Sequence, residues 1–329
     1  PEKMNIQKNF GITICAAGTS HYAAMVGKYW IEKFSSVPVN VELSSEYRYR
    51  NPATAMYSSM IVISQSGESI DTLMAMREAK RLNLTTTAIT NVENSSIDRE
   101  ADYSIFTHVG PEVGVASTKS FTSQLIVLLS IAMKLGMYNK KINSEKYQSF
   151  IQNLKLVPNF LSKILSLNDE FINLAQSIKN SQNILYLGRG ILYPLALEGA
   201  LKLKELSYIH SEGFAAGEMK HGPIALIEEG LPIIMFLTSD GIEEKSISNL
   251  QEALARGGEV FLISDQKNID KISFVENKVL IPSFDDTWND VFSPIFMSVP
   301  AQLIAYHVAR ERGTDVDQPR NLAKSVTVE

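Results

Sequence analysis

The 329 residues are 45% apolar and 20% charged, an ordinary globular composition with enough length for two hydrophobic cores. A formal net charge of −5, with acids and bases interspersed, excludes a basic nucleic-acid face and a polybasic membrane patch. No apolar run approaches the roughly 20 residues of a spanning helix, and the first ten residues lack the apolar core of a signal peptide. We expect a soluble, cytoplasmic protein with two domains.

The single cysteine, Cys15, lies in an apolar run with the character of a strand, which predicts a buried thiol and no disulfide framework. The five histidines show no spacing typical of metal ligands. We therefore expect no metal site and no cofactor.

Strands and helices are predicted in the same order in both halves of the chain. Strands are expected at 11–18, 59–63 and 86–90 and again at 183–190, 232–237 and 259–264; helices are expected at 21–34, 72–82 and 119–135 and again at 193–208, 243–256 and 294–310. Such alternation is typical of a doubly wound parallel sheet. The fold class is α/β, with two tandem flavodoxin-like domains.

The predicted boundaries follow this repeat. The first domain covers 1–144, the second covers 180–314, and a C-terminal segment covers 315–329. Residues 145–179 carry an apolar stripe at helical spacing, interrupted by Pro158, and no run of Gly or Ser. We expect a packed helical connector there.

A small polar turn after a buried strand is the part of the chain best suited to bind a ligand. The apolar run 60–63 leads into the sequence SQSGES at 64–69, and apolar residues then recur at helical spacing. Backbone N–H groups and the positive end of a helix dipole meet at such a turn, and three serine hydroxyls add donors. The turn predicts a phosphate site without a basic residue. Helix capping by these serines is the alternative.

The corresponding turn of the second half is acidic. It reads LTSDGIEEK, with Asp240, Glu243 and Glu244 where an anion would have to approach. The sequence therefore predicts one phosphate site per chain. Because ligands of open α/β sheets lie at the carboxyl ends of the strands, the segments 18–20 and 113–119 should face the same crevice. Ser20, Ser117 and Thr118 are candidates there, with plain capping again the alternative.

The segment 198–223 is dense in titratable residues. Glu198, Lys202 and Glu205 are spaced to lie on one helix face, and a solvated ladder of charges is one interpretation. In the other interpretation the helix runs into a glycine-rich loop at 213–222 that brings His221 to a ligand.

Six stretches together resemble the sugar isomerase (SIS) domains of the glucosamine-6-phosphate synthase family, the glutamine:fructose-6-phosphate aminotransferases that open the hexosamine pathway. They are AGTSHYAA, ISQSGESIDT, GVASTKSFTSQ, YPLALEGALKLKE, AAGEMKHGP and the ending GTDVDQPRNLAKSVTVE. The resemblance runs from about residue 10 to the last residue. The family also has an N-terminal glutaminase domain with a Cys nucleophile, which this sequence does not contain, so we expect no glutamine hydrolysis.

The resemblance implies a role for each matching residue. The phosphate would be held by Ser64, Gln65, Ser66 and Ser69, and the sugar would lie near Ser20, Val115, Ser117, Arg320 and Ala323. Lys324 matches the lysine that forms a Schiff base with the open-chain ketose, Glu205 the base that moves a proton between C1 and C2, and Lys202 an assisting residue. His221 matches the ring-opening histidine, which the neighbouring subunit supplies, so the resemblance implies a homodimer.

These roles agree with general chemistry. A carboxylate that reaches two adjacent carbons can move a proton between them. A lysine, unlike an arginine, can lose its proton and form an imine. The expected activity is conversion of fructose 6-phosphate and ammonia to glucosamine 6-phosphate, or isomerisation to glucose 6-phosphate without the glutaminase domain.

Two alternatives differ in the residues that they need. A fructosamine-phosphate deglycase would use the same phosphate turn, but we expect it to have a different C-terminal segment from the one that carries Lys324. A module that binds sugar phosphate without turnover would need the serines but not Glu205, His221 and Lys324 together.

Overall fold

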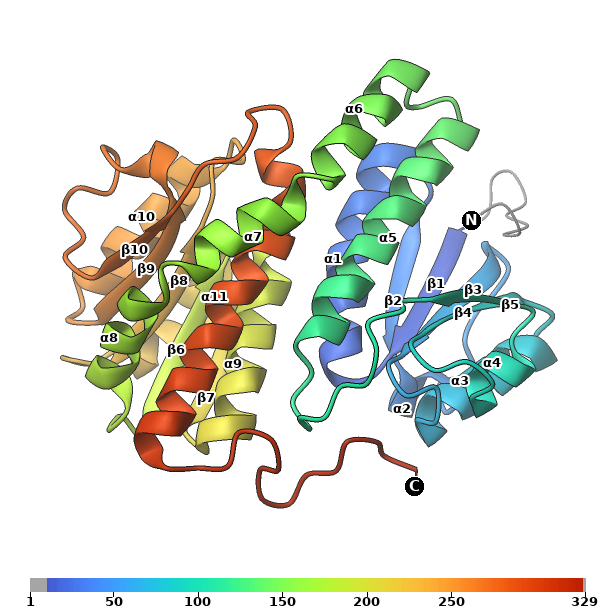
Figure 1. Cartoon of the computed structure of the whole chain (residues 1–329), viewed down its shortest axis with the longest axis horizontal. Helices are drawn as coiled ribbons and strands as arrows, with labels where there is room; N and C mark the ends of the chain where they lie inside the picture. Colours follow the sequence, from blue (N-terminus) through green and yellow to red (C-terminus); the bar gives the residue numbers. More distant parts are fainter. Residues whose placement is uncertain (1–10, 328–329) are drawn as a thin grey trace. The chain divides into compact units, whose positions relative to one another are not determined.

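A computed structural model describes residues 11–327 (Figure 1). The chain forms two compact units. The first comprises residues 1–148 and 323–329, and the second comprises residues 149–322. Residues 1–10, where the first predicted domain begins and where a signal peptide is not expected, lie outside the described residues, as do residues 328–329 of the C-terminal segment.

Five parallel strands form the sheet of the first unit, in the order β2-β1-β3-β4-β5. Its three central strands are apolar or β-branched and buried along most of their length, as expected for a sheet covered on both faces. The bounds are β1 Gly11–Ala16, β2 Val39–Leu43, β3 Tyr57–Ser64, β4 Thr85–Thr90 and β5 Tyr103–Phe106. The strand order reverses between β1 and β3, which is where sheets of this kind bind ligands.

Helices cover both faces of this sheet (Figure 1). Helices α1 (Gly18–Ser35) and α5 (Lys119–Tyr138) pack together on one face, where Gly27 allows a close approach because a Cβ there would lie 3.0 Å from Leu128 Cδ2. The other face carries α3 (Ile70–Arg81) with the short helices α2 (Ser44–Tyr47) and α4 (Ser96–Glu100).

Three helices occupy the region of the predicted connector: α6 (Ser144–Leu154), α7 (Val157–Leu165) and α8 (Asn168–Ile178). Pro158 lies in the first turn of α7, where a missing N–H removes no helical hydrogen bond. The division between the two units falls within α6, at 148–149. The predicted domain boundaries stay predictions.

The second unit repeats the topology of the first. Its parallel sheet has the order β10-β9-β8-β6-β7. Read from β7, this is second, first, third, fourth and fifth strand of the unit, the same order as in the first sheet. The bounds are β6 Asn183–Gly188, β7 His210–Ala215, β8 Pro232–Leu237, β9 Glu259–Asp265 and β10 Lys278–Ile281. The predicted fold, two tandem doubly wound α/β sheets, is confirmed.

Long helices again cover both faces (Figure 1). Helices α9 (Tyr193–Ser207) and α11 (Asn289–Arg312) pack together, with α7 and α8 against α11, while α10 (Glu243–Leu254) covers the opposite face of β8 and β9. Aromatic rings link α7 to α11, with the Phe160 and Phe296 centroids 4.2 Å apart. The unit also has four short 3₁₀ helices. Helix η1 (Gly190–Leu192) follows β6, η2 (Ala216–His221) follows β7, η3 (Pro223–Leu226) follows η2, and η4 (Gln266–Asn268) follows β9.

Four strands were not predicted from the sequence: β2, β5, β7 and β10. Strand β7 corrects the interpretation that the charged helix runs directly into a glycine-rich loop, since Gly213 lies in the strand. A Cβ at Gly213 would lie 2.7 Å from Ala196 O and 2.7 Å from Leu197 N, so only glycine lets this strand pack on the backbone of α9.

Among residues 11–327, α5 and α11 are long and apolar enough to cross a membrane by length and composition alone, so the expectation that no apolar run approaches this length is wrong. Of their most apolar stretches, 61% and 83% of the residues are buried inside the structure, because α5 packs on α1 and α11 packs on α8 and α9. The predicted burial of Cys15 is confirmed: the thiol is 0% exposed, and burial raises its pKa to about 12.

Candidate functional site

The turn after β3 gathers serine hydroxyls and backbone N–H groups at the carboxyl edge of the first sheet. Ser64 ends β3, and its hydroxyl accepts the N–H of Gly67 at 3.1 Å and donates to Ser69 Oγ at 3.2 Å. The hydroxyl of Ser66 accepts the N–H of Glu68 at 3.1 Å. The backbone carbonyl of Gln65 accepts the N–H of Asn91 at 3.1 Å. Residues 64–69, which we call the cradle, form a compact group of neutral donors.

The position of Ser69 bears on the choice between helix capping and anion binding. Ser69 is the N-cap residue of α3, yet its side chain makes no capping hydrogen bond to the helix. The carbonyl of Val326, not the Ser69 side chain, accepts the N–H of Ile70 at the start of α3, and the positive end of this helix lies at the turn beside the serine hydroxyls. This geometry favours anion binding over capping.

Gly67 is the residue that allows the turn to close. Its φ is +68°, and a Cβ at this position would lie 2.0 Å from Ser95 Oγ. Its carbonyl accepts the N–H of Ile97 at 2.9 Å, which joins the cradle to α4.

Two further groups of predicted residues lie on the same unit. Ser20 lies in the first turn of α1, directly after β1. Strands β1 and β3 are neighbours, with Ala16 opposite Ile63, so Ser20 and the cradle follow neighbouring strands. Val115 and Ser117 are half-buried in the segment between β5 and α5.

The end of the chain returns to the first unit and places Lys324 beside that segment. Lys324 Nζ lies 2.5 Å from Glu112 Oε2 and 2.8 Å from the carbonyl oxygen of Gly114. The carboxylate of Glu112 also accepts the N–H groups of Thr118 at 3.0 Å and Ser120 at 3.2 Å. Partial burial works against the charged carboxylate, yet the hydrogen bonds from these residues outweigh it and lower the pKa of Glu112.

The next two residues of the C-terminal segment contact the cradle itself. Ser325 Oγ lies 3.0 Å from Ser66 Oγ, and the carbonyl of Val326 accepts the N–H of Ile70, the first residue of α3, at 3.2 Å. Lys324 and the cradle thus lie on the same unit. Ala323 belongs to this unit too, as the residue at which the C-terminal segment re-enters it.

The second unit carries the charged face of α9. Glu198 is 0% and Lys202 1% exposed, so the interpretation of this face as a solvated ladder is wrong. Lys202 Nζ lies 2.5 Å from Glu205 Oε2 and 3.6 Å from Glu198 Oε1. Burial disfavours the ammonium, but the two carboxylates together raise the pKa of Lys202. Lys202 therefore stays charged.

The remaining predicted residues are exposed on the second unit. His221 ends η2. The N–H of Arg320 donates to Tyr208 Oη at 2.8 Å, and its guanidinium lies 4.0 Å from the centroid of the Tyr208 ring. The structure brings Lys202 and Glu205 into contact, and it places these four residues on a different unit from the cradle.

The turn after β8, which corresponds to the cradle, is filled by side chains of the protein. Asp265, 1% exposed, accepts the N–H of Ser239 at 2.8 Å and the hydroxyl of Thr238 at 3.0 Å. Asp240 and Glu243 accept the N–H groups of Ile242 at 3.0 Å and Gly241 at 2.8 Å. Burial raises the pKa of Asp240 to about 6. Internal carboxylates thus occupy the donors that an anion would need.

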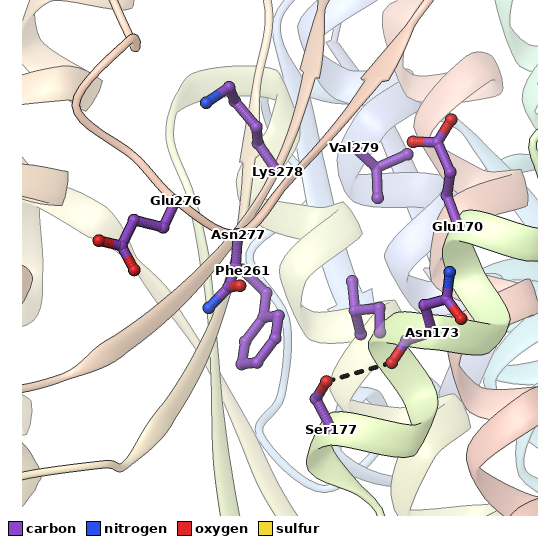
Figure 2. A pocket seen from close by; sticks show the side chains of 9 residues that line it. Glu170, Asn173, Ser177, Phe261, Glu276, Asn277, Lys278 and Val279 are labelled. Atoms are coloured by element: carbon purple, nitrogen blue, oxygen red, sulfur yellow. Dashed lines mark hydrogen bonds between the residues drawn. The ribbon is translucent and has the colours of Figure 1, made fainter.

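A shallow pocket of the second unit lies between α8 and strands β9 and β10 (Figure 2). Phe261 and Lys278, near the amino ends of their strands, line it together with Glu170 and Asn173 of α8. None of the predicted site residues lines this pocket. It lies away from the carboxyl ends of the strands, where sheets of this kind bind ligands.

Within the described part of the chain, no three His, Cys, Asp or Glu side chains gather as metal ligands would. Sequence reasoning did not single out Glu112, Ser325, Val326 or Asp265. Glu112 lies close to Ser117 in the sequence GPEVGVAS. However, no neighbouring residue indicates its contact with Lys324, which is 212 residues away.

The comparisons with known proteins agree with this architecture. The family model for the SIS domain matches residues 6–134 and 177–312, one match for each sheet. The chain therefore belongs to the SIS domain family.

Within this family, the resemblance to the isomerase domain of glucosamine-6-phosphate synthase is confirmed. The solved C-terminal domain of glucosamine-fructose-6-phosphate aminotransferase from Francisella tularensis is 40% identical, with a TM-score of 0.91, and the match covers 95% of this chain and 87% of that one. Glucosamine-6-phosphate deaminase from Thermotoga maritima, 24% identical over 96% of this chain and 90% of that one with a TM-score of 0.76, shares the fold.

Two curated relatives bear the name glutamine–fructose-6-phosphate aminotransferase [isomerizing]. The relative from Zymomonas mobilis is 50% identical over 97% of this chain, and that from Bradyrhizobium diazoefficiens is 48% identical over 99%. The chain covers 52% of each, so it spans about half the length of these relatives.

Proposed function

We propose that this chain is the ketose/aldose isomerase half of a glutamine:fructose-6-phosphate aminotransferase. It would convert fructose 6-phosphate and ammonia to glucosamine 6-phosphate and, without a source of ammonia, isomerise fructose 6-phosphate to glucose 6-phosphate. The names of the relatives support the substrate, and the observation that carries the proposal is the position of Lys324. A lysine from the end of the chain lies on the same unit as a neutral phosphate cradle, with Ser325 in contact with Ser66.

The cradle would bind the phosphate of the sugar. Ser64, Ser66 and Ser69 supply hydroxyls, Gln65 an amide and α3 its N-terminal N–H groups, all at the carboxyl edge of β3. The sugar would extend from this point past Ser20, Val115 and Ser117. Ala323 and Arg320 would close over it with the C-terminal segment.

The chemistry would need one amine and one carboxylate. Lys324 would lose a proton, attack the C2 carbonyl of the open-chain ketose and release water as the imine forms, which makes the C1 proton more acidic. Ammonia would then add to C2 of this imine and displace the amine of Lys324, which leaves an imine of ammonia at C2. Glu205 would take the proton from C1 and return it to C2, which yields glucosamine 6-phosphate with its aldehyde at C1. Without ammonia, the same transfer on the free C2 ketone yields glucose 6-phosphate. Lys202 would orient the side chain of Glu205 through the 2.5 Å contact.

Ring opening would fall to His221. We propose that the neighbouring subunit of a homodimer supplies it, as the family resemblance implies. Its exposed position at the end of η2 leaves the ring accessible to another chain.

Proton exchange measured by NMR tests the proposal. The chain is incubated with fructose 6-phosphate in deuterated buffer, beside Glu205→Gln and, as a control, Glu145→Gln, which changes an exposed residue in the first turn of α6. We expect glucose 6-phosphate with deuterium at C2 from the parent and the control. The Glu205→Gln variant should lose at least about a hundredfold in rate, the usual contribution of a general base.

Two results would contradict the proposal. Binding of fructose 6-phosphate without exchange in the parent chain would make it a sugar-phosphate binding module. Equal exchange in the parent and in Glu205→Gln would remove Glu205 from the reaction. Borohydride trapping adds a direct check, because an imine at Lys324 should be reduced to a stable adduct in the presence of fructose 6-phosphate.

A further inference from the structure

Glu112 joins the N-terminus of α5 to the end of the chain. Its carboxylate accepts the N–H groups of Thr118 and Ser120, the Ser120 hydroxyl at 2.8 Å, and the ammonium of Lys324 at 2.5 Å. The side chain of Glu112 is 5% exposed and that of Lys324 is 25% exposed. Charged hydrogen bonds shielded from solvent in this way are stronger than surface ion pairs.

The two partners depend on this contact unequally. Without Lys324, the carboxylate of Glu112 keeps three hydrogen bonds at the positive end of α5. Without Glu112, Lys324 keeps the single carbonyl of Gly114. Glu112 is thus an anion held in place by the helix, and Lys324 is the group that docks on it.

We infer that Glu112 is a positioning residue for Lys324: it holds the ammonium beside residues 113–117, so that the lysine is unreactive until a sugar phosphate displaces the contact. This inference rests on the proposed function for the role of Lys324 in the reaction, but the docking itself concerns the protein without sugar. Both contacts engage the nitrogen of Lys324, which is the atom that would have to attack a carbonyl.

The same contact sets the register of the C-terminal segment on the cradle. With Lys324 on Glu112, the next residue reaches Ser66 and the one after reaches the N–H of Ile70. These three consecutive contacts should loosen together. The amide of Ile70 is therefore a reporter of the docked lysine, remote from Glu112 in sequence.

Amine labelling of the sugar-free protein tests the inference. N-hydroxysuccinimidyl acetate reacts with unprotonated amines, and peptide mass spectrometry measures the rate at Lys324. We expect Glu112→Gln to raise this rate about tenfold, the factor that corresponds to about 1.4 kcal/mol. The matched control is Glu243→Gln, which removes the partner of Lys271 in a 2.9 Å pair whose lysine is 45% exposed; Lys271 should change less than about twofold.

Hydrogen exchange separates docking from capping. Glu112→Gln also weakens the cap of α5, so Lys324→Met removes the contact from the other side and leaves that cap intact. In this variant we expect faster exchange at the amide of Ile70. Unchanged exchange at Ile70 in Lys324→Met would overturn the inference, as would equal labelling of Lys324 in the parent and in folded Glu112→Gln. Both measurements omit sugar, so loss of the proposed isomerase activity would not affect them.

Discussion

At the scale of single residues, the cradle depends on one glycine for two separate reasons. A φ of +68° disfavours any side chain at Gly67, and the Ser95 hydroxyl occupies the place of a Cβ. Gly110, in the segment between β5 and α5, has the same φ of +68° but no atom within 4 Å of a would-be Cβ. A side chain at either glycine would therefore have the cost of a left-handed backbone, but only at Gly67 would its Cβ also collide with another residue.

Substitution of these glycines by alanine should separate the two terms. We expect Gly110→Ala to lower the free energy of unfolding by about 1–2 kcal/mol, the usual cost of a left-handed residue. Gly67→Ala should lower it further and also weaken binding of fructose 6-phosphate, because Ser95 must move and displace the turn. Chemical unfolding and isothermal titration calorimetry measure the two effects. Equal losses in both variants would show that the close contact with Ser95 is relieved without effect.

At the scale of elements, two equivalent strand–turn–helix units have opposite uses. In the turn between β3 and α3, neutral serine hydroxyls accept the N–H groups of Gly67 and Glu68. In the turn between β8 and α10, the carboxylates of Asp240, Glu243 and Asp265 accept the N–H groups. Asp265 also accepts from Asn289 Nδ2 at 3.0 Å, which joins the end of β9 to α11. The second turn therefore carries negative charge at the position where the first turn is neutral.

Removal of that carboxylate should destabilise the second unit. Asp265→Ala leaves the hydroxyl of Thr238 and the N–H of Ser239 without an acceptor and removes one of the two acceptors of Asn289 Nδ2, so we expect a loss of about 2–4 kcal/mol in the free energy of unfolding. Asp286→Ala is the control: its side chain is 89% exposed and pairs with Lys267, so the change should stay within about 0.5 kcal/mol. Equal stability of the two variants in urea unfolding would contradict the structural role of Asp265.

At the scale of the whole molecule, the candidate residues are divided between two compact units and, in our proposal, between two subunits. The phosphate cradle and Lys324 belong to one unit, and Glu205 and His221 to the other. Sharing of His221 across a homodimer has a consequence that mixing of inactive variants can reveal.

His221→Ala and Glu205→Gln should complement each other. In a mixed dimer, one site combines Glu205 of the first subunit with His221 of the second, and the other site has neither. After subunit exchange of an equal mixture, we expect about a quarter of the parent activity, since half of the dimers are mixed and each has one intact site. Activity no greater than the sum of the separate variants would place His221 and Glu205 of each site on the same chain.

The sequence by itself determined the features that depend on neighbouring residues. Short apolar runs that alternate with segments of helical periodicity predicted two doubly wound sheets. The sequence SQSGES after such a run predicted the cradle. Both predictions were possible because strand, turn and helix preferences depend on a few neighbouring residues. The repeat of this order in both halves predicted the duplication that the two sheets confirm. The specific roles of Lys324, Glu205 and His221 came from the family resemblance rather than from local physics.

Only the tertiary structure decided the features that join distant parts of the chain. Spacing places Glu198 and Lys202 on one helix face, but only the packing of α9 shows that this face is buried. Strand β7 is short and contains a glycine, and it is recognisable as a strand only from its pairing with β6. Glu112 and Lys324 are 212 residues apart, and their contact depends on the return of the chain's end to the first unit. Such contacts have no local signal, because they depend on how distant elements pack and not on neighbouring residues.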